Sequence, residues 1–432
     1  MSVYIEKLSH DGRGIARVSG KTTFIRGALA QEEVEFRLTR SKRDFDEGEV
    51  TTILQASADR VMPACAHYTR CGGCSLQHLH APAQIVAKNE ILMDQLARIG
   101  HVTPRHVRAP LTADVWHYRY KARLSVSFDK KTRSIRIGFR DQQQPDLIVD
   151  VQRCHVLIDA VNPLLDPLRA LLKTLPNPGI IPQIEVAAGD DDLALIIRHL
   201  KPLPDVWIVQ LKAFAQEAGV RIYLQAAGPK SVTLLFPENA SPWLHYALPA
   251  FGINFKWHPT DFTQVNPRMN QYMVSHALEL LDLQLSDVAL DLFCGLGNFT
   301  LPMALFCQHV MGMEGSETMV ERARMNAANH EIKNAEFFCA SLDSAQSLAS
   351  VASRHINKIL MDPPRTGAYD LVKNMEIIAP ERIVYVSCNP STLARDVDVL
   401  VHQKGYTLDT VMAMDMFPHT THVESMALLI RE

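Results

Sequence analysis

Apolar and polar residues alternate along the first 57 residues of the chain. Short apolar runs, among them VYIEKL, GIARV and EEVEFRLT, are separated by segments typical of turns, such as HDGRG and VSGK. An alternation with a period of two, interrupted at short intervals by glycine-containing turns, is typical of small all-β folds. We therefore predict a small β-barrel, similar to OB folds, over residues 1–57.

The pattern becomes helical over residues 84–99, where apolar side chains recur at helical spacing and Gly100 follows as a candidate C-cap. From Tyr118 to about Leu248 the pattern is mainly that of strands, interrupted by one expected helix around Leu203–Gly219. These residues predict a mainly-β central domain.

After residue 260, short apolar strands alternate with helical segments. Asn266 and Pro267 are residue types preferred at the start of a helix, and the strand VALDLF follows that helix. Such an alternation is typical of a doubly wound, mostly parallel sheet. The last third of the chain is therefore expected to be a Rossmann-like α/β domain.

The composition is that of ordinary globular domains, with 47% apolar and 21% charged residues. No apolar stretch approaches the roughly 20 residues that a membrane-spanning helix needs. The first residues lack the charged-then-apolar layout of a secretion signal. We expect a cytoplasmic protein without a membrane partner, in which clustered cysteines bind metal or take part in catalysis more often than they form disulfides.

Basic residues gather between Arg105 and Arg140, where ten Arg or Lys accompany only two Asp in a chain of net charge -3. Such a local excess is expected of a surface that binds a polyanion. Trp116, Tyr118 and Tyr120 are interleaved with it and are able to stack on unpaired bases. The alternative is a solvated hairpin whose aromatic residues pack internally.

A glycine-containing motif, DLFCGLGNFT, follows the first strand of the α/β domain and opens a helix. Its glycines let a ligand approach the backbone, and the helix N-terminus favours polar or anionic groups. Glu314 ends the next strand, where a carboxylate can accept both hydroxyls of a ribose. Because the full G-x-G-x-x-G pattern of dinucleotide sites is missing, the motif indicates a nucleoside methyl donor rather than a dinucleotide.

Two further strands are followed by candidate binding or catalytic residues. Asp362 lies on a rigid Asp-Pro-Pro turn, from which its side chain can contact the edge of a planar base. Cys388, in VSCNP, precedes a helix whose N-terminus would stabilise a thiolate. Addition of that thiolate to C6 of uracil makes C5 a nucleophile toward an electrophilic methyl group.

The methylated intermediate requires a base, because its C5 carries a proton that must leave before the thiolate does. Glu424, in HVES, is the candidate, whereas His419 and His422 are expected to shape the loop. Taken singly, Asp362, Cys388 and Glu424 also fit a simple turn, a structural cysteine and a surface carboxylate.

Four cysteines form a separate group. Cys65, Cys71 and Cys74 have a C-x5-C-x2-C spacing, and Cys154 follows 80 residues later. Four thiolates suit an iron–sulfur cluster or zinc. The second C-x2-C pair of many zinc sites is missing, which favours iron–sulfur, and four unrelated thiols are the remaining alternative.

Taken in order, DLFCGLGNFTLP, MDPPRTG, VSCNPSTLARD and HVES resemble the motifs of the bacterial RNA uracil-5-methyltransferase family, and the resemblance extends over essentially the whole chain. It implies use of S-adenosyl-L-methionine (SAM), with Cys388 as nucleophile and Glu424 as base. It also implies a set of contacts to the methyl donor, from Gln264, Phe293, Asn298, Glu314, Ser341 and Asp362. Some relatives carry a longer polar side chain at the position of Ser341.

The cysteine motif and the N-terminal barrel together resemble the branch of the family that acts on 23S rRNA. In that branch the barrel is an RNA-binding TRAM domain and the four cysteines hold a [4Fe-4S] cluster. The helix near residues 84–100 packs on the catalytic domain, so the domains are discontinuous. The expected fold is therefore multidomain, with a TRAM-like barrel (1–57), a mainly-β iron–sulfur domain (58–76 and 110–255) and a Rossmann-like SAM-dependent methyltransferase domain (77–109 and 256–432).

The expected partner is 23S rRNA, with the target uridine flipped out of a remodelled single-stranded segment. A monomer is expected because one chain contains every needed part. Two alternatives stay open, namely methylation of another rRNA or tRNA uridine and a non-catalytic RNA-binding protein. An iron–sulfur radical methylase is disfavoured, because that chemistry uses a C-x3-C-x2-C triad that this chain lacks.

Overall fold

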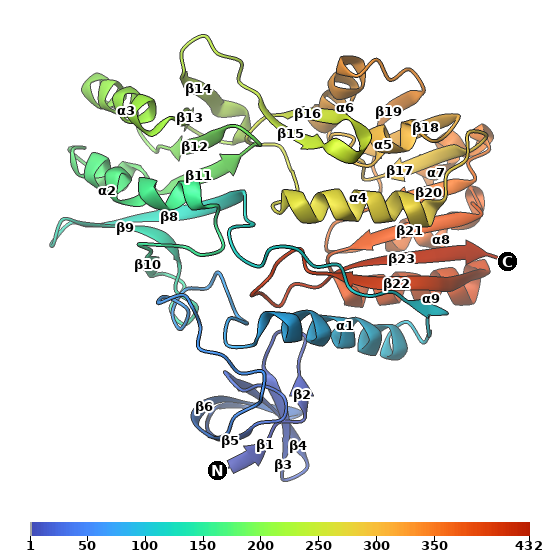
Figure 1. The fold of residues 1–432 in the computed structure, drawn as a ribbon, viewed down its shortest axis with the longest axis horizontal. Helices are drawn as coiled ribbons and strands as arrows, with labels where there is room; N and C mark the ends of the chain where they lie inside the picture. Colours follow the sequence, from blue (N-terminus) through green and yellow to red (C-terminus); the bar gives the residue numbers. More distant parts are fainter. Residues whose placement is uncertain (1) are drawn as a thin grey trace.

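The computed structural model describes residues 2–432, so Met1, the first residue of the predicted barrel, lies outside it. Three large sheets build a small N-terminal part, a central part and a C-terminal part with helices on both faces (Figure 1). Within residues 2–432, no helix combines the length and the apolar character that crossing a bilayer requires.

The N-terminal sheet lies beneath α1 in Figure 1 and has the strand order β1-β5-β6-β4-β3-β2. Its strands are β1 (Ser2–Tyr4), β2 (Lys7–Leu8), β3 (Gly14–Val18), β4 (Lys21–Arg26), β5 (Glu33–Ser41) and β6 (Phe45–Gln55). Ile5, Ile25 and Val34 lie in its small apolar core. Among the described residues the outer strands β1 and β2 do not pair, so hydrogen bonds leave the predicted barrel open at this seam, where β2 has only two residues.

The central sheet has seven strands in the order β10-β9-β8-β11-β12-β13-β14. They are β8 (Lys121–Asp129), β9 (Ser134–Arg140), β10 (Ile148–Asp150), β11 (Gln183–Ala188), β12 (Leu193–Arg198), β13 (Arg221–Gln225) and β14 (Val232–Phe236). The predicted helix is confirmed as α3 (Asp205–Ala218), which ends at Gly219 with a left-handed φ of 65°.

The central part contains a second helix, α2 (Leu165–Lys173), so the prediction of a single helix there is wrong. Pro163 and Pro167 hid it in the sequence. Pro167 is tolerated because it lies in the first turn, where a backbone N–H has no partner within the helix. Together, α2 and α3 pack on the central sheet through Leu168 and Trp207.

The C-terminal sheet has eight strands in the order β19-β18-β17-β20-β21-β23-β22-β7. They are β7 (His106–Val107), β17 (Val288–Leu292), β18 (His309–Glu314), β19 (Ala335–Cys339), β20 (Lys358–Met361), β21 (Arg382–Ser387), β22 (Tyr406–Met414) and β23 (Glu424–Arg431). The first five strands of that order run parallel, and β23 runs antiparallel to both of its neighbours. This confirms the predicted α/β domain.

Seven helices accompany this sheet. They are α1 (Ala81–Arg98), α4 (Pro267–Leu281), α5 (Thr300–Ala304), α6 (Glu317–Asn329), α7 (Ala345–Val351), α8 (Tyr369–Lys373) and α9 (Pro390–Lys404). One apolar core contains residues of α4, α5 and α6, and a second contains residues of α1, α7, α8 and α9. The N-cap predicted for α4 is confirmed, because the Asn266 side chain accepts a hydrogen bond from the N–H of Met269 at 3.2 Å.

The segment between residues 77 and 109 joins the C-terminal part, since α1 packs on α9 and β7 pairs with β22. The C-cap role predicted for Gly100 is wrong, because α1 is capped by Ile99. A Cβ atom at Gly100 would lie 2.8 Å from the carbonyl oxygen of Leu96 and 3.0 Å from that of Ala394 in α9. Glycine is therefore needed here for a close approach between α1 and α9 rather than for a left-handed turn.

A two-stranded hairpin, β15 (Leu244–Leu248) and β16 (Ile253–Trp257), leads from the central part to α4. Phe255 and Trp257 are buried in the same core as α4. The predicted limit between residues 255 and 256 therefore falls inside β16.

Candidate active site

The parallel part of the C-terminal sheet reverses its strand order between β17 and β20. Ligands of open α/β sheets bind at the carboxyl ends of the strands beside such a reversal. Asp362 directly follows β20, and Cys388 directly follows β21. In the antiparallel pair β21–β23, Ser387 lies opposite Ser425. The residues next to this pair, Cys388 and Glu424, therefore lie at the same edge of the sheet.

The loop after β17 bends sharply around the end of β18. Phe293 has a left-handed φ of 67°, and its N–H donates to the carbonyl of Met313 at 2.8 Å. Gly295, with φ 56°, donates its N–H to Oε2 of Glu314 at 3.2 Å, and Oε1 of Glu314 accepts from Ser316 N–H at 3.0 Å. The carboxylate of Glu314 is thus held at the mouth of the loop with lone pairs still available to a ligand.

Asn298 is oriented by a partner that the sequence did not reveal. Its side-chain amide exchanges two hydrogen bonds of 2.9 Å with the amide of Asn270 on α4. The Tyr246 hydroxyl also donates to Oδ1 of Asn298 at 2.9 Å. The only sequence signal for Asn270 is a polar residue on the apolar side of a helix, and that signal does not identify its partner.

Three carboxylates converge beside this loop. Burial raises the pKa of Asp291 to about 8, with further increases from Asp362 and Glu314 and an opposing hydrogen bond from Thr300. Burial also raises the pKa of Asp362 to about 7. A bound cation would favour the ionised form of these carboxyl groups, so the cluster suits a ligand that brings its own positive charge.

The other two predicted donor contacts do not follow the strands beside the reversal. Gln264 is half-buried in the loop between β16 and α4. Ser341 is exposed two residues beyond β19, the outermost strand, and its hydroxyl donates to Asp343. Of the six predicted positions, Phe293, Asn298, Glu314 and Asp362 therefore border the strand ends beside the reversal.

The thiol of Cys388 is half-buried. Its pKa is raised to about 11 by burial first and then by the carboxylates of Glu424 and Asp362, whereas Arg365 lowers it. In the free protein, burial and the two carboxylates therefore outweigh the stabilisation of the thiolate that we expect from the helix N-terminus. Asn389 caps α9 and also donates its side-chain N–H to the carbonyl of Arg365 at 3.0 Å, which ties the cysteine loop to the Asp-Pro-Pro turn.

Glu424 begins β23 with only 3% of its surface exposed. No described residue forms a hydrogen bond with its Oε2. Its pKa is raised to about 8 by burial first and then by Asp362, while Arg365 and Lys88 lower it. A buried carboxylate with one unpaired oxygen and a pKa near neutrality suits a general base.

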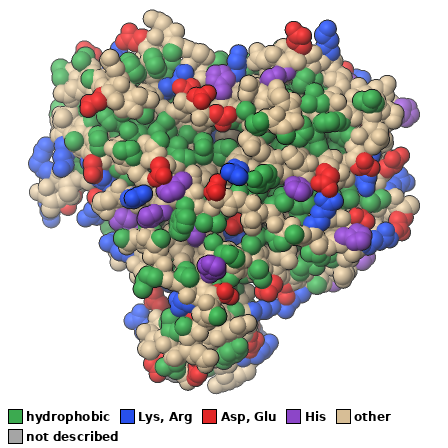
Figure 2. All heavy atoms as spheres, viewed as in Figure 1, with side chains coloured by type: hydrophobic (Ala, Val, Ile, Leu, Met, Phe, Trp, Pro, Cys, Tyr) green, Lys and Arg blue, Asp and Glu red, His purple; other side chains and the backbone are tan. Residues whose placement is uncertain are grey.

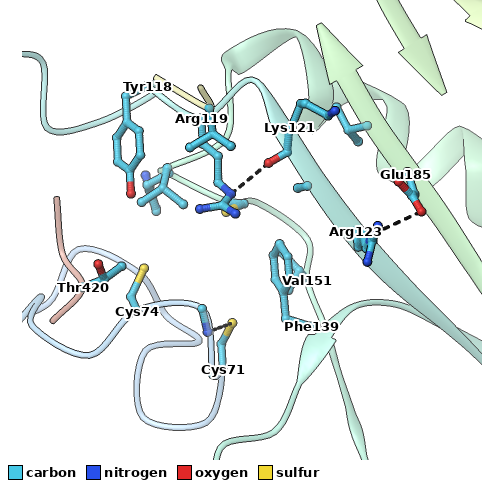
Figure 3. Close-up of a pocket in the computed structure, with 18 of the residues that line it drawn as sticks. Cys71, Cys74, Tyr118, Arg119, Lys121, Arg123, Phe139, Val151, Glu185 and Thr420 are labelled. Carbon is cyan, nitrogen blue, oxygen red and sulfur yellow. Dashed lines mark hydrogen bonds and ion pairs between the residues drawn. The ribbon is translucent and has the colours of Figure 1, made fainter. Parts of the chain in front are cut away.

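One cavity of about 540 Å³ lies between the central and C-terminal parts. It is lined by the four cysteines of the separate group, Cys65, Cys71, Cys74 and Cys154. Figure 3 shows the sulfurs of Cys71 and Cys74 directed into it, opposite Tyr118 and Arg119. All eight cysteines fall within the described range and are free thiols. Over that same range, no three His, Cys, Asp or Glu side chains are grouped closely enough to hold a single metal ion.

The basic segment does not form one patch. Arg105 and Arg108 pair with Glu432 and Glu279 of the C-terminal part. A second group, Arg119, Lys121 and Arg123, lines the cavity of the cysteines. The third group is exposed at the tip of the β8–β9 hairpin, which forms the blue cluster at the left edge of Figure 2, and comprises Lys130, Lys131 and Arg133.

Two of the interleaved aromatic residues pack internally, as in the alternative interpretation. The ring of Trp116 stacks on that of His419 with 3.7 Å between the ring centroids. Tyr118 is 4% exposed and donates its hydroxyl to the carbonyl of Pro418 at 2.9 Å. The expectation that these two rings stack on RNA bases is wrong, because they hold the loop that precedes Glu424.

Comparison with known proteins gives consistent results. The family model described as tRNA (Uracil-5-)-methyltransferase matches residues 82–432, and that of the TRAM domain matches residues 1–51. A 23S rRNA (uracil(1939)-C(5))-methyltransferase RlmD from Legionella pneumophila (strain Paris) is 51% identical over 424 residues, or 98% of this chain and 96% of the relative. The protein of the same name from Alcanivorax borkumensis is 48% identical over 98% of this chain and 95% of the relative.

Among solved structures, the tRNA (uracil-54, C5)-methyltransferase of Pyrococcus abyssi, in complex with S-adenosyl-L-homocysteine, has a similar fold. The two chains superpose with a TM-score of 0.75 and 25% sequence identity, and the match covers 100% of each. The family model, the near-complete relatives and this fold agree with the motifs at the strand ends. The chain belongs to the RNA uracil-5-methyltransferase family and carries an N-terminal TRAM domain.

Proposed function

We propose that this chain methylates C5 of a uracil in 23S rRNA, at the site named in its relatives, uracil 1939. Cys388 acts as the nucleophile and Glu424 as the base. The observation that carries the proposal is the register of β21 and β23, which brings Cys388 and Glu424 together beside Asp362.

The proposed reaction starts with the Cys388 thiol, which gives its proton to solvent water and adds as a thiolate to C6 of the uracil. The electrons of the C5=C6 bond then make C5 nucleophilic, and C5 accepts the methyl group. Glu424 next takes the proton from C5, and the sulfur leaves C6 as the double bond re-forms. The raised pKa of Cys388, to about 11, implies that substrate binding must help to deprotonate the thiol.

S-adenosyl-L-methionine, when bound, supplies an electrophilic methyl group with a positive charge on sulfur. The residues beside the strand reversal fit such a ligand. Glu314 keeps lone pairs free for the ribose hydroxyls, and the buried carboxylates of Asp291 and Asp362 complement a cation. We assign donor contacts to Gln264, Phe293, Asn298, Glu314, Ser341 and Asp362.

We assign a [4Fe-4S] cluster to Cys65, Cys71, Cys74 and Cys154. The support is that the four thiols line one cavity, since four cysteine thiolates are the ligands that such a cluster takes. Because methylation is redox-neutral, these residues would order the central part rather than transfer electrons. Anaerobically purified protein should contain about four iron and four sulfide per chain, and Cys154→Ser should lose both while Cys307→Ala keeps them.

The proposed domains are 1–57 for TRAM, 58–76 with 110–255 for the iron–sulfur domain, and 77–109 with 256–432 for the methyltransferase domain, and the first residues of β16 pack with the methyltransferase domain through Phe255. The packing of α1 on α9 supports the discontinuous assignment. RNA would contact Arg119 and Arg123, with its target uridine flipped toward Cys388. We further propose a cytoplasmic monomer.

The test of the proposal uses a 23S rRNA transcript that carries 5-fluorouridine, together with a labelled methyl donor. Fluorine at C5 cannot leave as a proton does, so the adduct with Cys388 should persist after denaturation. Cys388→Ala should abolish the adduct, and Cys307→Ala, which alters a buried thiol elsewhere, should not. An adduct with tRNA only would overturn the substrate, and no adduct with either RNA would favour an RNA-binding protein without catalysis.

A further inference from the structure

The hairpin loop of residues 415–423 connects β22 to β23 and leads directly to Glu424. His419 lies at its centre with 3% of its surface exposed and a left-handed φ of 65°. This conformation is unfavourable for a residue with a side chain and persists where surrounding contacts hold it. The contacts of His419 therefore determine where the loop lies.

Helix α1 holds His419 through one buried amide. The N–H of His419 donates to Oε1 of Gln84 at 2.7 Å, and Nε2 of Gln84 lies 3.1 Å from Nδ1 of the imidazole. The same Nε2 lies 3.1 Å from the carbonyl oxygen of Leu76 and 2.8 Å from that of Leu79, so its two N–H groups are shared among three acceptors. Gln84 is fully buried, so every one of these hydrogen bonds is protected from water.

The cysteine segment holds the same residue from the other side. The backbone N–H groups of Ser75 and Leu76, directly after Cys74, both donate to the carbonyl of His419, at 2.9 and 3.0 Å. Trp116 covers the imidazole face. His419 thus joins α1, the cysteine segment and the loop before Glu424.

The rest of the loop contacts two cations that face Glu424. Lys88 of α1 donates to Asp415 at 2.6 Å and to the carbonyl of Phe417 at 3.0 Å, and it lies near enough to Glu424 to affect its charge. From the Asp-Pro-Pro turn, Arg365 lies 3.1 Å from Nδ1 of His422. Displacement of the loop would therefore disturb the buried surroundings of Glu424.

We propose that His419 is a positioning residue for Glu424, through which α1 and the cysteine segment fix the base. The inference rests on the proposed role of Glu424. It predicts an effect on one step of the reaction, because Glu424 acts only after methyl transfer. Weakening the contacts of His419 should slow proton removal from C5 while leaving adduct formation and methyl transfer intact.

The test uses RNA with unmodified uridine, on which the covalent complex normally turns over. It measures the amount of methyl-labelled covalent complex, the rate of product release and the RNA affinity. His419→Ala removes the stacking and the imidazole acceptor. We expect product release to fall about 10- to 100-fold, less than the 100- to 10,000-fold that a missing general base costs, while the adduct accumulates. His419→Asn tolerates the left-handed conformation and retains an acceptor for Gln84, so it should recover part of the rate.

Three controls separate the possible failures. Glu424→Gln should accumulate the most adduct, and if it accumulates none the proposed base is wrong, independently of His419. Asn357→Ala removes an amide that joins β17 and β20 where these strands begin, at the end of the sheet away from the site. This variant should not accumulate adduct. Gln84→Met removes the hydrogen bonds of this amide to His419 and to the carbonyls of Leu76 and Leu79, and it decides the question if His419→Ala fails to fold.

If His419→Ala and Gln84→Met lower adduct formation and product release equally, or change neither, the positioning role is wrong. A weaker RNA affinity with unchanged release from the adduct would also overturn it, since His419 would then act on binding. Accumulation in these variants and in Glu424→Gln, but not in Asn357→Ala, is the expected result.

Discussion

The ammonium group of Lys88 lies 2.6 Å from the carboxylate of Asp415, and the two side chains are only 1% and 3% exposed. They belong to residues 327 positions apart, on α1 and on the loop before Glu424. An ion pair this deeply buried contributes to stability mainly because loss of either partner leaves the other charge unpaired. The pair therefore makes the structure around Glu424 dependent on α1.

Replacement of Lys88 by Met should destabilise the protein strongly. The Asp415 carboxylate would remain buried without its partner, which typically costs about 3–5 kcal/mol. The thermal unfolding midpoint should fall accordingly. The double variant Lys88→Met with Asp415→Leu removes both charges and should recover most of the loss. A double variant as unstable as the single one would contradict this account.

Stability should decrease as the pH rises from about 5 to 8. The folded protein keeps a proton on Glu424 up to about pH 8, whereas the ordinary pKa of a glutamate is 4.5, so unfolding releases a proton within this interval and becomes more favourable. The groups that face Glu424 are Asp362, Arg365, Lys88 and Cys388. Differential scanning fluorimetry at several pH values measures the slope.

Glu424→Gln tests that assignment, because it cannot release this proton. Its slope should be smaller but not zero, since burial also raises the pKa of Asp291 to about 8 and that of Asp362 to about 7.

In the wild-type protein, release of product from a preformed adduct should accelerate as Glu424 loses its proton and level off above about pH 8. An unchanged unfolding slope in Glu424→Gln would be evidence against the raised pKa.

Gly367 should not tolerate a side chain. It has a φ of 77°, and an added Cβ would lie 2.6 Å from both Nη2 of Arg395 and Oδ2 of Asp396. Oδ2 of Asp396, which is fully buried, accepts hydrogen bonds from Ala368 N–H and the Tyr385 hydroxyl and so cannot move freely. Gly367→Ala should therefore disturb the Asp-Pro-Pro turn and reduce methylation.

Gly405 offers a matched control for that variant. Its φ of 75° is nearly the same, but no atom lies within 4 Å of an added Cβ. Gly405→Ala should cost only the roughly 1 kcal/mol of the left-handed conformation, whereas Gly367→Ala adds the steric clash. Equal losses in unfolding experiments would show that backbone conformation alone explains the effect.

The sequence predicted the residues at strand ends and missed those that hold them. Asp362, Cys388 and Glu424 could be predicted because motifs after apolar strands of a parallel sheet meet at one edge. Gln84 and His419, 335 positions apart, carry no local signal of their contact. For the same reason the helix N-terminus suggested a low pKa for Cys388, while the opposing carboxylates of Asp362 and Glu424 were visible only in the structure.

The β8–β9 tip offers a test of where RNA binds. Lys130, Lys131 and Arg133 are exposed. Within residues 2–432, none of these three side chains forms an ion pair with a carboxylate. If the tip contacts phosphates, replacing all three by Ala should weaken binding to rRNA and reduce the salt dependence of log Kd by about 0.7–0.9 per lost contact. The turnover number at saturating RNA should stay unchanged, because the tip lies at the left edge of Figure 1, away from β21, the strand that precedes Cys388. The matched control Arg198→Ala, Lys201→Ala and Lys230→Ala removes the same charge from other exposed positions of the central part. Equal losses of affinity in the two variants would assign the effect to net charge and exclude the tip as a specific contact.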